Sequence, residues 1–150
     1  MTIKTLSQVR KFLNGIDDIN FGGCGVAALA LYRWCKAHGL KPDGFAWLYK
    51  DYEADDLVSN ENAIQSQELD NLYVPCHVAL QLDGLLYDSA TSEASNTCRT
   101  SLTQPGISES VLLHLLNDSR GWNSYFDRKT QVPIIAKTLD IDLSDVTLTT

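Results

Sequence analysis

The chain has few basic residues and no long apolar run. Its 150 residues include 12 lysines and arginines against 19 aspartates and glutamates, which gives a formal net charge of −7. Duplex nucleic acid binds to basic faces that neutralise phosphates, so this balance argues against a nucleic-acid partner. No stretch approaches the roughly 20 apolar residues of a membrane span, and the N-terminal residues lack the apolar core of a signal peptide. We therefore expect no membrane partner.

Cysteine is also scarce. The four cysteines, Cys24, Cys35, Cys76 and Cys98, are too few for a disulfide scaffold and form no Cys-x-x-Cys pair. No set of side chains stands at zinc-ligand spacing, and no glycine-rich phosphate loop is present. The sequence therefore predicts a cytoplasmic protein with reduced thiols, no metal and no cofactor.

The length and composition fit one domain. A chain of this size with 44% hydrophobic residues can bury a core without help from disulfides or metals. Because we find no repeat, low-complexity tract or linker, residues 1–150 are expected to form a single domain.

Four segments carry helical patterns. The clearest is 24–38, which is apolar around most of its circumference and is followed by Gly39 as a stop signal. A helix of that kind is buried, with other elements on several sides. The other helices are expected at 5–14 with Thr5 or Ser7 as N-cap, at 108–116, and at 132–139 with Pro133 in the first turn.

Strand patterns occur in two places, so the predicted fold class is α+β. Residues 45–49 alternate in an aromatic run, and one hypothesis makes them an exposed strand that pairs with a partner. Two further strand-like runs flank Asp83-Gly84, which is a strong hairpin signal. The remaining segments are predicted to be an acidic loop at 51–72 with some helix near 64–69, a Ser/Thr-rich loop at 89–105, and an extended or frayed tail at 141–150.

Cys24 is the first candidate for chemistry. It follows Gly22 and Gly23 and opens the buried helix, where unpaired N–H groups and the helix dipole favour a thiolate. The two glycines would let a substrate backbone approach the sulfur, so they are candidate substrate-binding residues. The competing interpretation is that Cys24 is a small buried hydrophobic residue.

The hairpin brings a histidine and a carboxylate together. With a two-residue turn at Asp83-Gly84, Leu80 faces Tyr87, and His77 and Asp88 become diagonal neighbours on one sheet face. A thiol at a helix start, a strand histidine and a carboxylate are the parts of an activated nucleophile, its base and the group that orients the base. His77 and Asp88 taken singly would be ordinary polar strand residues.

The order Cys, His, Asp, with Gly-Gly-Cys-Gly opening a buried helix and a His-Val-Ala-Leu-Gln-Leu-Asp-Gly-Leu-Leu-Tyr-Asp hairpin, resembles the papain-like cysteine protease superfamily. Its transglutaminase-like, arylamine N-acetyltransferase-like and papain-fold toxin-like branches use that order. The match covers about residues 21–89 and assigns no single family. The resemblance implies that Cys24 is the nucleophile, His77 the general base and Asp88 the orienting residue. It also implies that the Cys24 helix packs on a small antiparallel sheet, with additional C-terminal helices.

The sequence departs from papain proper near the cysteine. A glutamine that serves the oxyanion hole in that family is absent, and the nearest suitable amide is Asn20. Asn20 is therefore predicted to share the oxyanion hole with the Cys24 backbone N–H. An asparagine before glycines is also typical of a turn or a cap, and that alternative stays open.

These features predict a cysteine enzyme that acts on an amide or related acyl group of a protein or peptide substrate, as a peptidase, amidase, glutamine deamidase or acyltransferase. The alternative is a catalytically silent binding protein of the same fold, such as a viral or toxin-like effector. Cys35, Cys76 and His114 are weaker candidates, because their neighbours indicate ordinary structural positions.

Overall fold

Five helices and a four-stranded antiparallel sheet make up the computed structural model, which describes residues 2–89, 101–122 and 125–148. The predicted α+β class is confirmed. The helices are α1 (Leu6–Asn14), α2 (Cys24–Ala37), α3 (Ala54–Ser66), α4 (Glu109–Leu116) and α5 (Arg128–Leu139), with short 3-10 turns at Asp51–Glu53 and Leu69–Asn71. The strands are β1 (Gly44–Lys50), β2 (His77–Leu82), β3 (Leu85–Tyr87) and β4 (Ser101–Ile107).

The sheet order is β3-β2-β1-β4, so β1 is an inner strand. Residues 45–49 are all buried, and β1 pairs with β2 on one side and with β4 on the other. The hypothesis of an exposed docking strand at 45–49 is therefore wrong. An aromatic alternating run indicates a strand but does not say whether both of its edges are paired.

The hairpin forms with the predicted register. Leu82 pairs with Leu85 and Leu80 with Tyr87. Asp83 and Gly84 have φ angles of 52° and 76°, as a type I′ turn requires. This turn fixes which residues of β2 and β3 stand opposite each other, and so it places His77 near Asp88.

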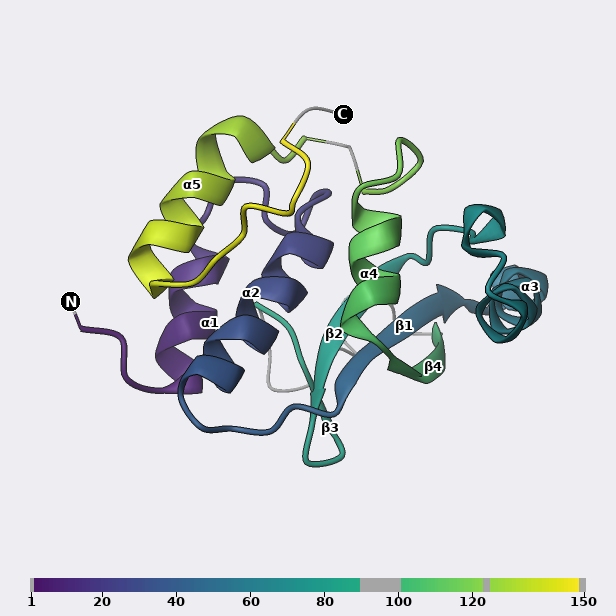
Figure 1. The fold of residues 1–150 in the computed structure, drawn as a ribbon, viewed down its shortest axis with the longest axis horizontal. Helices are drawn as coiled ribbons and strands as arrows, with labels where there is room; N and C mark the ends of the chain where they lie inside the picture. The colour runs from purple at the N-terminus through teal and green to yellow at the C-terminus, as the bar shows by residue number, and fades with distance from the viewer. Residues whose placement is uncertain (1, 90–100, 123–124, 149–150) are drawn as a thin grey trace.

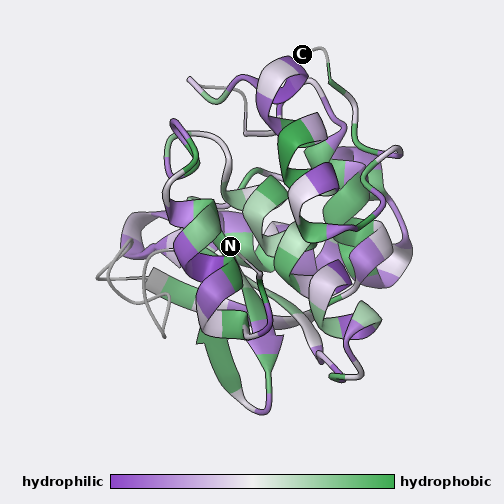
Figure 2. Cartoon of the chain, turned by 90° about the vertical axis from the view of Figure 1, so that its left-hand side faces the viewer, coloured by the Kyte–Doolittle hydropathy of each residue, from purple (hydrophilic) through white to green (hydrophobic). Residues whose placement is uncertain are grey.

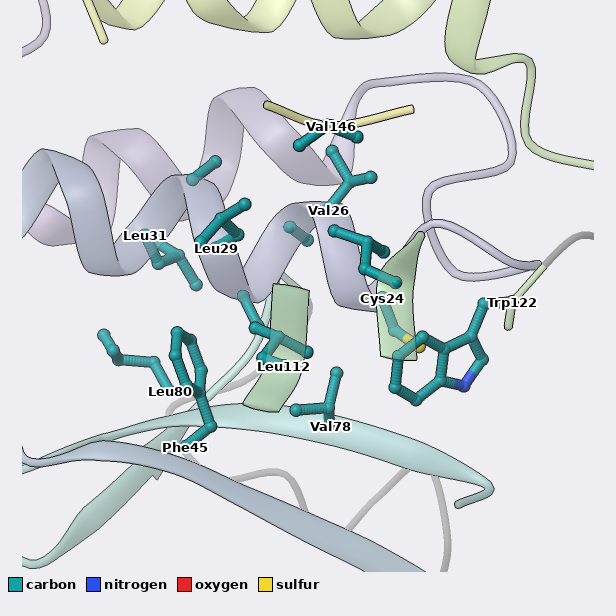
Figure 3. Close-up of a cluster of buried hydrophobic side chains, with 14 of the residues drawn as sticks. Cys24, Val26, Leu29, Leu31, Phe45, Val78, Leu80, Leu112, Trp122 and Val146 are labelled. Atoms are coloured by element: carbon teal, nitrogen blue, oxygen red, sulfur yellow. The ribbon is translucent and has the colours of Figure 1, made fainter. Parts of the chain in front are cut away.

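Helix α2 lies at the centre of the molecule, with α1 and α5 on one side and α4 and the sheet on the other (Figure 1). Its side chains join those of β1 and β2 in the main hydrophobic cluster, including Leu29, Leu31, Phe45 and Leu80 (Figure 3). The helices at the periphery carry many hydrophilic residues, whereas β2 and β3 are mostly hydrophobic (Figure 2). The prediction of a buried helix beginning at Cys24 is confirmed.

Helices α1 and α4 begin as predicted. Thr5 caps α1 by accepting from the Gln8 N–H, and the Gln8 side chain accepts in return from the Thr5 N–H, which completes a capping box. Ser108 caps α4 through the N–H of Val111.

Two predicted loops are wrong in part. Most of the acidic stretch 51–72 is helix α3, whose buried face includes the polar residue Asn60, so the apolar pattern of a helix is weak there. The Asn60 amide bonds the Tyr49 hydroxyl and both backbone polar groups of Tyr73, which replaces apolar contact with hydrogen bonds. The end of the predicted loop 89–105 is part of β4, an edge strand that tolerates Pro105. The rest of that loop, including Cys98, lies largely outside the described residues.

The last helix starts earlier than predicted. Asp127 caps α5 by accepting from the N–H of Thr130, and this start moves Pro133 from the first turn into the helix interior. The tail that follows is neither extended throughout nor frayed in its described part. It has a turn at Ser144 and Asp145, and Leu143 and Val146 are buried in the main cluster.

Among the cysteines that the structure describes, the redox state differs from the prediction at Cys76. Cys76 is disulfide-bonded, whereas Cys24 and Cys35 are free thiols. The expectation of reduced thiols is therefore wrong for Cys76. Disulfides persist mainly in oxidising compartments, and a low cysteine count argues against a disulfide scaffold but does not exclude a single bond.

In the described part of the chain, no helix combines the length and the apolar character that crossing a bilayer would need.

Candidate active site

His77 and Asp88 form a buried pair. Nε2 of His77 lies 3.1 Å from Oδ2 of Asp88, and the two residues are 3% and 4% exposed. β2 supplies the histidine as its first residue, and Asp88 directly follows the last residue of β3. The diagonal arrangement predicted from the hairpin register is thus present as a hydrogen bond.

Cys24 completes the group from a different element. It is the first residue of α2, it is 7% exposed, and its thiol is close enough to His77 to raise the pKa of the imidazole. Because Nε2 of the imidazole faces Asp88, Nδ1 is the nitrogen left to exchange a proton with the sulfur. The structure therefore brings Cys24, His77 and Asp88 together in the order of a nucleophile, a base and an orienting carboxylate.

The surroundings of His77 favour its charged form. Burial alone lowers the pKa of this imidazole, but the hydrogen bonds to Asp88 and Cys24, together with the negative charges of both, outweigh it. The net result is a pKa raised to about 9. At neutral pH His77 is then an imidazolium between two acidic groups, and such a cation stabilises a neighbouring thiolate.

The start of α2 presents backbone donors beside the sulfur. Its N-cap is Gly23, which has no side chain to accept from the first N–H groups, in contrast to Thr5 at the start of α1. The first N–H groups of a helix have no acceptor within it. The N–H of Cys24 is therefore placed as a donor toward negative charge that develops next to its own side chain.

Asn20 lies close to the carboxylate segment. Its Oδ1 accepts from the Ser89 hydroxyl at 2.9 Å, and its Nδ2 lies 3.4 Å from Oδ1 of Asn14. The first bond joins the loop before Cys24 to the residue after Asp88. Both contacts engage the amide away from the sulfur, so its role as an oxyanion donor stays a prediction.

The structure explains why glycine occupies positions 22 and 23. Gly22 has a φ of 106°, which L residues rarely adopt. A Cβ on Gly23 would lie 2.7 Å from the carbonyl oxygen of Ile19 and 2.9 Å from Cδ1 of Phe126. These structural roles do not test the prediction that the two glycines bind substrate, which stays a prediction.

Replacement of Gly23 with alanine should lower the free energy of unfolding by about 1–3 kcal/mol, because the new methyl group meets backbone that cannot move aside. Urea titration measures this effect. Gly15→Ala is the matched control, since a Cβ there would have no neighbour closer than 3.4 Å and φ is −84°. Equal unfolding midpoints for the two variants would contradict the packing argument.

Two contacts near the site were not visible in the sequence. Nε of Arg10 donates to the backbone carbonyl of Asp88 at 2.6 Å, although Arg10 lies on α1. Trp122 lies beside the Cys24 sulfur (Figure 3), and its Nε1 donates to the Pro75 carbonyl. The two hydrogen bonds join residues that are 78 and 47 positions apart, and no local sequence pattern predicts them.

Trp122 also limits access to the thiol. Its ring packs near the first turn of α2, where a Cβ on Gly25 would lie 2.9 Å from ring atom Cε3. Cys24 and Trp122 are 7% and 9% exposed, so little of either residue is open to solvent in this conformation.

The weaker candidates have structural surroundings. Cys35 is a buried thiol in the last turn of α2, and burial raises its pKa to about 11. His114 on α4 has its Nε2 3.3 Å from Oδ1 of Asp70, so its nearest acidic group is a surface carboxylate. Within the described ranges, no group of three or more His, Cys, Asp or Glu side chains is placed to hold a metal ion.

Comparison with known proteins adds no relative: no family model, curated protein or solved structure matches this chain.

Proposed function

We propose that this protein is a cysteine enzyme that acts on an amide or related acyl group through a covalent acyl-enzyme. The observation that carries the proposal is the buried contact of one imidazole with both a carboxylate and a thiol, the thiol standing at a helix N-terminus. Structural cysteines do not need a charged histidine beside them, whereas a neighbouring imidazolium is one of the established ways to activate a nucleophilic cysteine.

In the first step the Cys24 thiolate attacks the carbonyl carbon of the substrate. A carbon–sulfur bond forms, and the oxygen of the tetrahedral intermediate accepts from the Cys24 N–H, with Asn20 as the proposed second donor. His77 then gives its Nδ1 proton to the leaving amine as the carbon–nitrogen bond breaks. Asp88 keeps the imidazole oriented through Nε2.

In the second step an acceptor attacks the thioester. His77, now neutral, takes a proton from the acceptor, and the carbon–sulfur bond breaks to regenerate the thiolate. Water as the acceptor gives hydrolysis or deamidation, and an amine gives acyl transfer. Gly22 and Gly23 lie next to the sulfur in the chain, and we propose that the substrate backbone passes over this side.

The arrangement is consistent with a papain-like fold, in which a buried helix bearing the nucleophile packs on an antiparallel sheet that supplies the base. We propose that assignment together with a protein or peptide substrate. The cytoplasmic location expected from composition is disfavoured by the disulfide at Cys76, since reducing compartments rarely keep such bonds.

One observation favours the second candidate, a binding protein without chemistry. Cys24 is only 7% exposed, so the sulfur is nearly closed off in this conformation. In that case the buried triad would serve stability alone, and the protein would act through its surface.

Covalent trapping separates the two candidates. The protein is incubated with p-nitrophenyl acetate, an acyl thioester and a glutamine-containing peptide, and the intact mass and peptide masses are followed. We expect one acyl group on Cys24, released with time by water or an added amine.

Cys24→Ala should abolish the adduct, and Cys35→Ala, which removes the other free thiol among the described residues, should leave it unchanged. Acylation that is confined to lysines, or that is equal in wild type and Cys24→Ala, would exclude the enzyme.

A further inference from the structure

One side chain outside the triad holds the backbone of Asp88. Nε of Arg10 donates to the Asp88 carbonyl at 2.6 Å, and the Arg10 guanidinium carbon lies 5.5 Å from the centre of the Tyr87 ring. The same guanidinium thus contacts two consecutive residues, the last of β3 and the carboxylate that follows it.

Asp88 occupies a position where such support matters. β3 has only three residues, lies at the edge of the sheet, and ends at Tyr87. The bond from His77 to Asp88 is 3.1 Å, near the long end of the usual range, so a small backbone shift would break it. Asp88 therefore lies beyond the regular strand and yet must be placed to within a fraction of an ångström.

The Arg10 side chain comes from a firmly placed helix. Its neighbours Val9 and Leu13 are fully buried in the main cluster, and the Thr5 capping box fixes the start of α1. α1 also packs against α2, the helix that begins with Cys24. Arg10 thus links the backbone of Asp88 to the packed pair of helices α1 and α2, and α2 carries Cys24.

We infer that Arg10 is a positioning residue, which holds Asp88 in hydrogen-bond range of His77 through the Asp88 carbonyl. This inference rests on the proposed function for its purpose, but its geometry does not depend on catalysis. Asn20, through Ser89, ties the other side of Asp88 to the loop before α2.

The charges around the site predict the direction in which the His77 pKa shifts when Arg10 is replaced. Among the described residues, the titratable groups that face His77 are Asp88 and Cys24. Those that face Arg10 are Asp88 and Tyr87. Burial lowers the pKa of Arg10, and the interactions with Asp88 and Tyr87 raise it. Loss of the Arg10 charge alone would make a nearby imidazolium easier to form. Loss of the Asp88 position would make it harder. The two mechanisms therefore shift the His77 titration in opposite directions.

The test compares Arg10→Ala, Arg10→Lys and the control Lys11→Ala, which removes one exposed positive charge from the same helix. The His77 titration is followed by NMR, with thermal unfolding recorded separately. We expect the His77 midpoint in Arg10→Ala to fall by about one pH unit or more, since a carboxylate has left hydrogen-bond range. Arg10→Lys, which keeps the charge and a donor, should restore part of the shift, and Lys11→Ala should match the wild type.

An unchanged or raised midpoint in a folded Arg10→Ala protein would overturn the inference. If Arg10→Ala does not fold, Arg10→Lys decides: a midpoint below the wild-type value supports the inference, and an equal midpoint overturns it. An unreactive Cys24 would contradict the proposed function, but it would leave the titration of His77 valid as a test of Arg10.

Discussion

Replacement of His77 with alanine should slow the alkylation of Cys24 by iodoacetamide at pH 7 by about 30-fold or more. In the wild-type protein the His77 imidazolium, with a pKa raised to about 9, is a partner that favours the thiolate. Without that cation the sulfur becomes an ordinary thiol, and a free cysteine is only about 3% thiolate at pH 7.

The measurement is a time course of alkylation of each free cysteine, read by peptide mass spectrometry over a pH series. His77→Gln is a second variant of similar size, which separates loss of the base from loss of the fold. Cys35 is the internal reference: burial raises its pKa to about 11, so it should stay slow in every protein. Alkylation of Cys24 at one rate in all three proteins would mean that no thiolate–imidazolium pair exists.

Replacement of Asp88 with asparagine should lower the pKa of His77 from about 9 toward the ordinary histidine value of 6.5. Burial lowers this pKa in both proteins, and the contact with Asp88 is foremost among those that raise it. The asparagine carbonyl can still accept from Nε2–H, so the variant removes the charge while it keeps the orientation of the ring.

NMR titration of the imidazole signals measures the shift. The chain has three histidines, and His38 and His114 serve as references that should not move. A His77 midpoint that stays near its wild-type value in Asp88→Asn would show that the carboxylate is not responsible for the charge on the ring.

The same pair makes stability depend on pH. The pKa of His77 is higher in the folded state, about 9, than the 6.5 expected in the unfolded chain. Its contribution to stability is therefore fully present below pH 6.5 and is lost as the pH rises through 9. Between these values the unfolding free energy of the wild type should fall more steeply than that of Asp88→Asn.

Much of the site could be predicted because its signals are local. The turn at Asp83-Gly84 fixes the hairpin register, and a side-chain period of two then puts His77 diagonal to Asp88. The glycines before Cys24 and the apolar run after it indicate the start of a buried helix. That the thiol faces the histidine is a matter of tertiary packing, and in the sequence only the resemblance to a known superfamily suggested it.

The Arg10 contact, helix α3 and strand β4 could not be predicted, and each has a physical reason. The contact of Arg10 with Asp88 joins two residues 78 positions apart through a long flexible side chain, and no periodic pattern encodes such a pair. Helix α3 was missed because Asn60, a fully buried amide, stands on its inner face where an apolar residue would have given a signal. β4 was missed because Pro105-Gly106 is typical of a turn, and only the pairing with β1 makes it a strand.

The parts of the triad come from the start of one helix and from a hairpin much later in the chain, where His77 begins β2 and Asp88 directly follows β3. A nascent polypeptide therefore contains Cys24 long before it contains His77 and Asp88. During synthesis that cysteine has no base and behaves as an ordinary thiol. Its reactivity appears only when the two distant segments have docked. The labelling rate of Cys24 therefore reports on folding. Labelling at intervals after dilution from denaturant would show when the tertiary contacts between the two segments form.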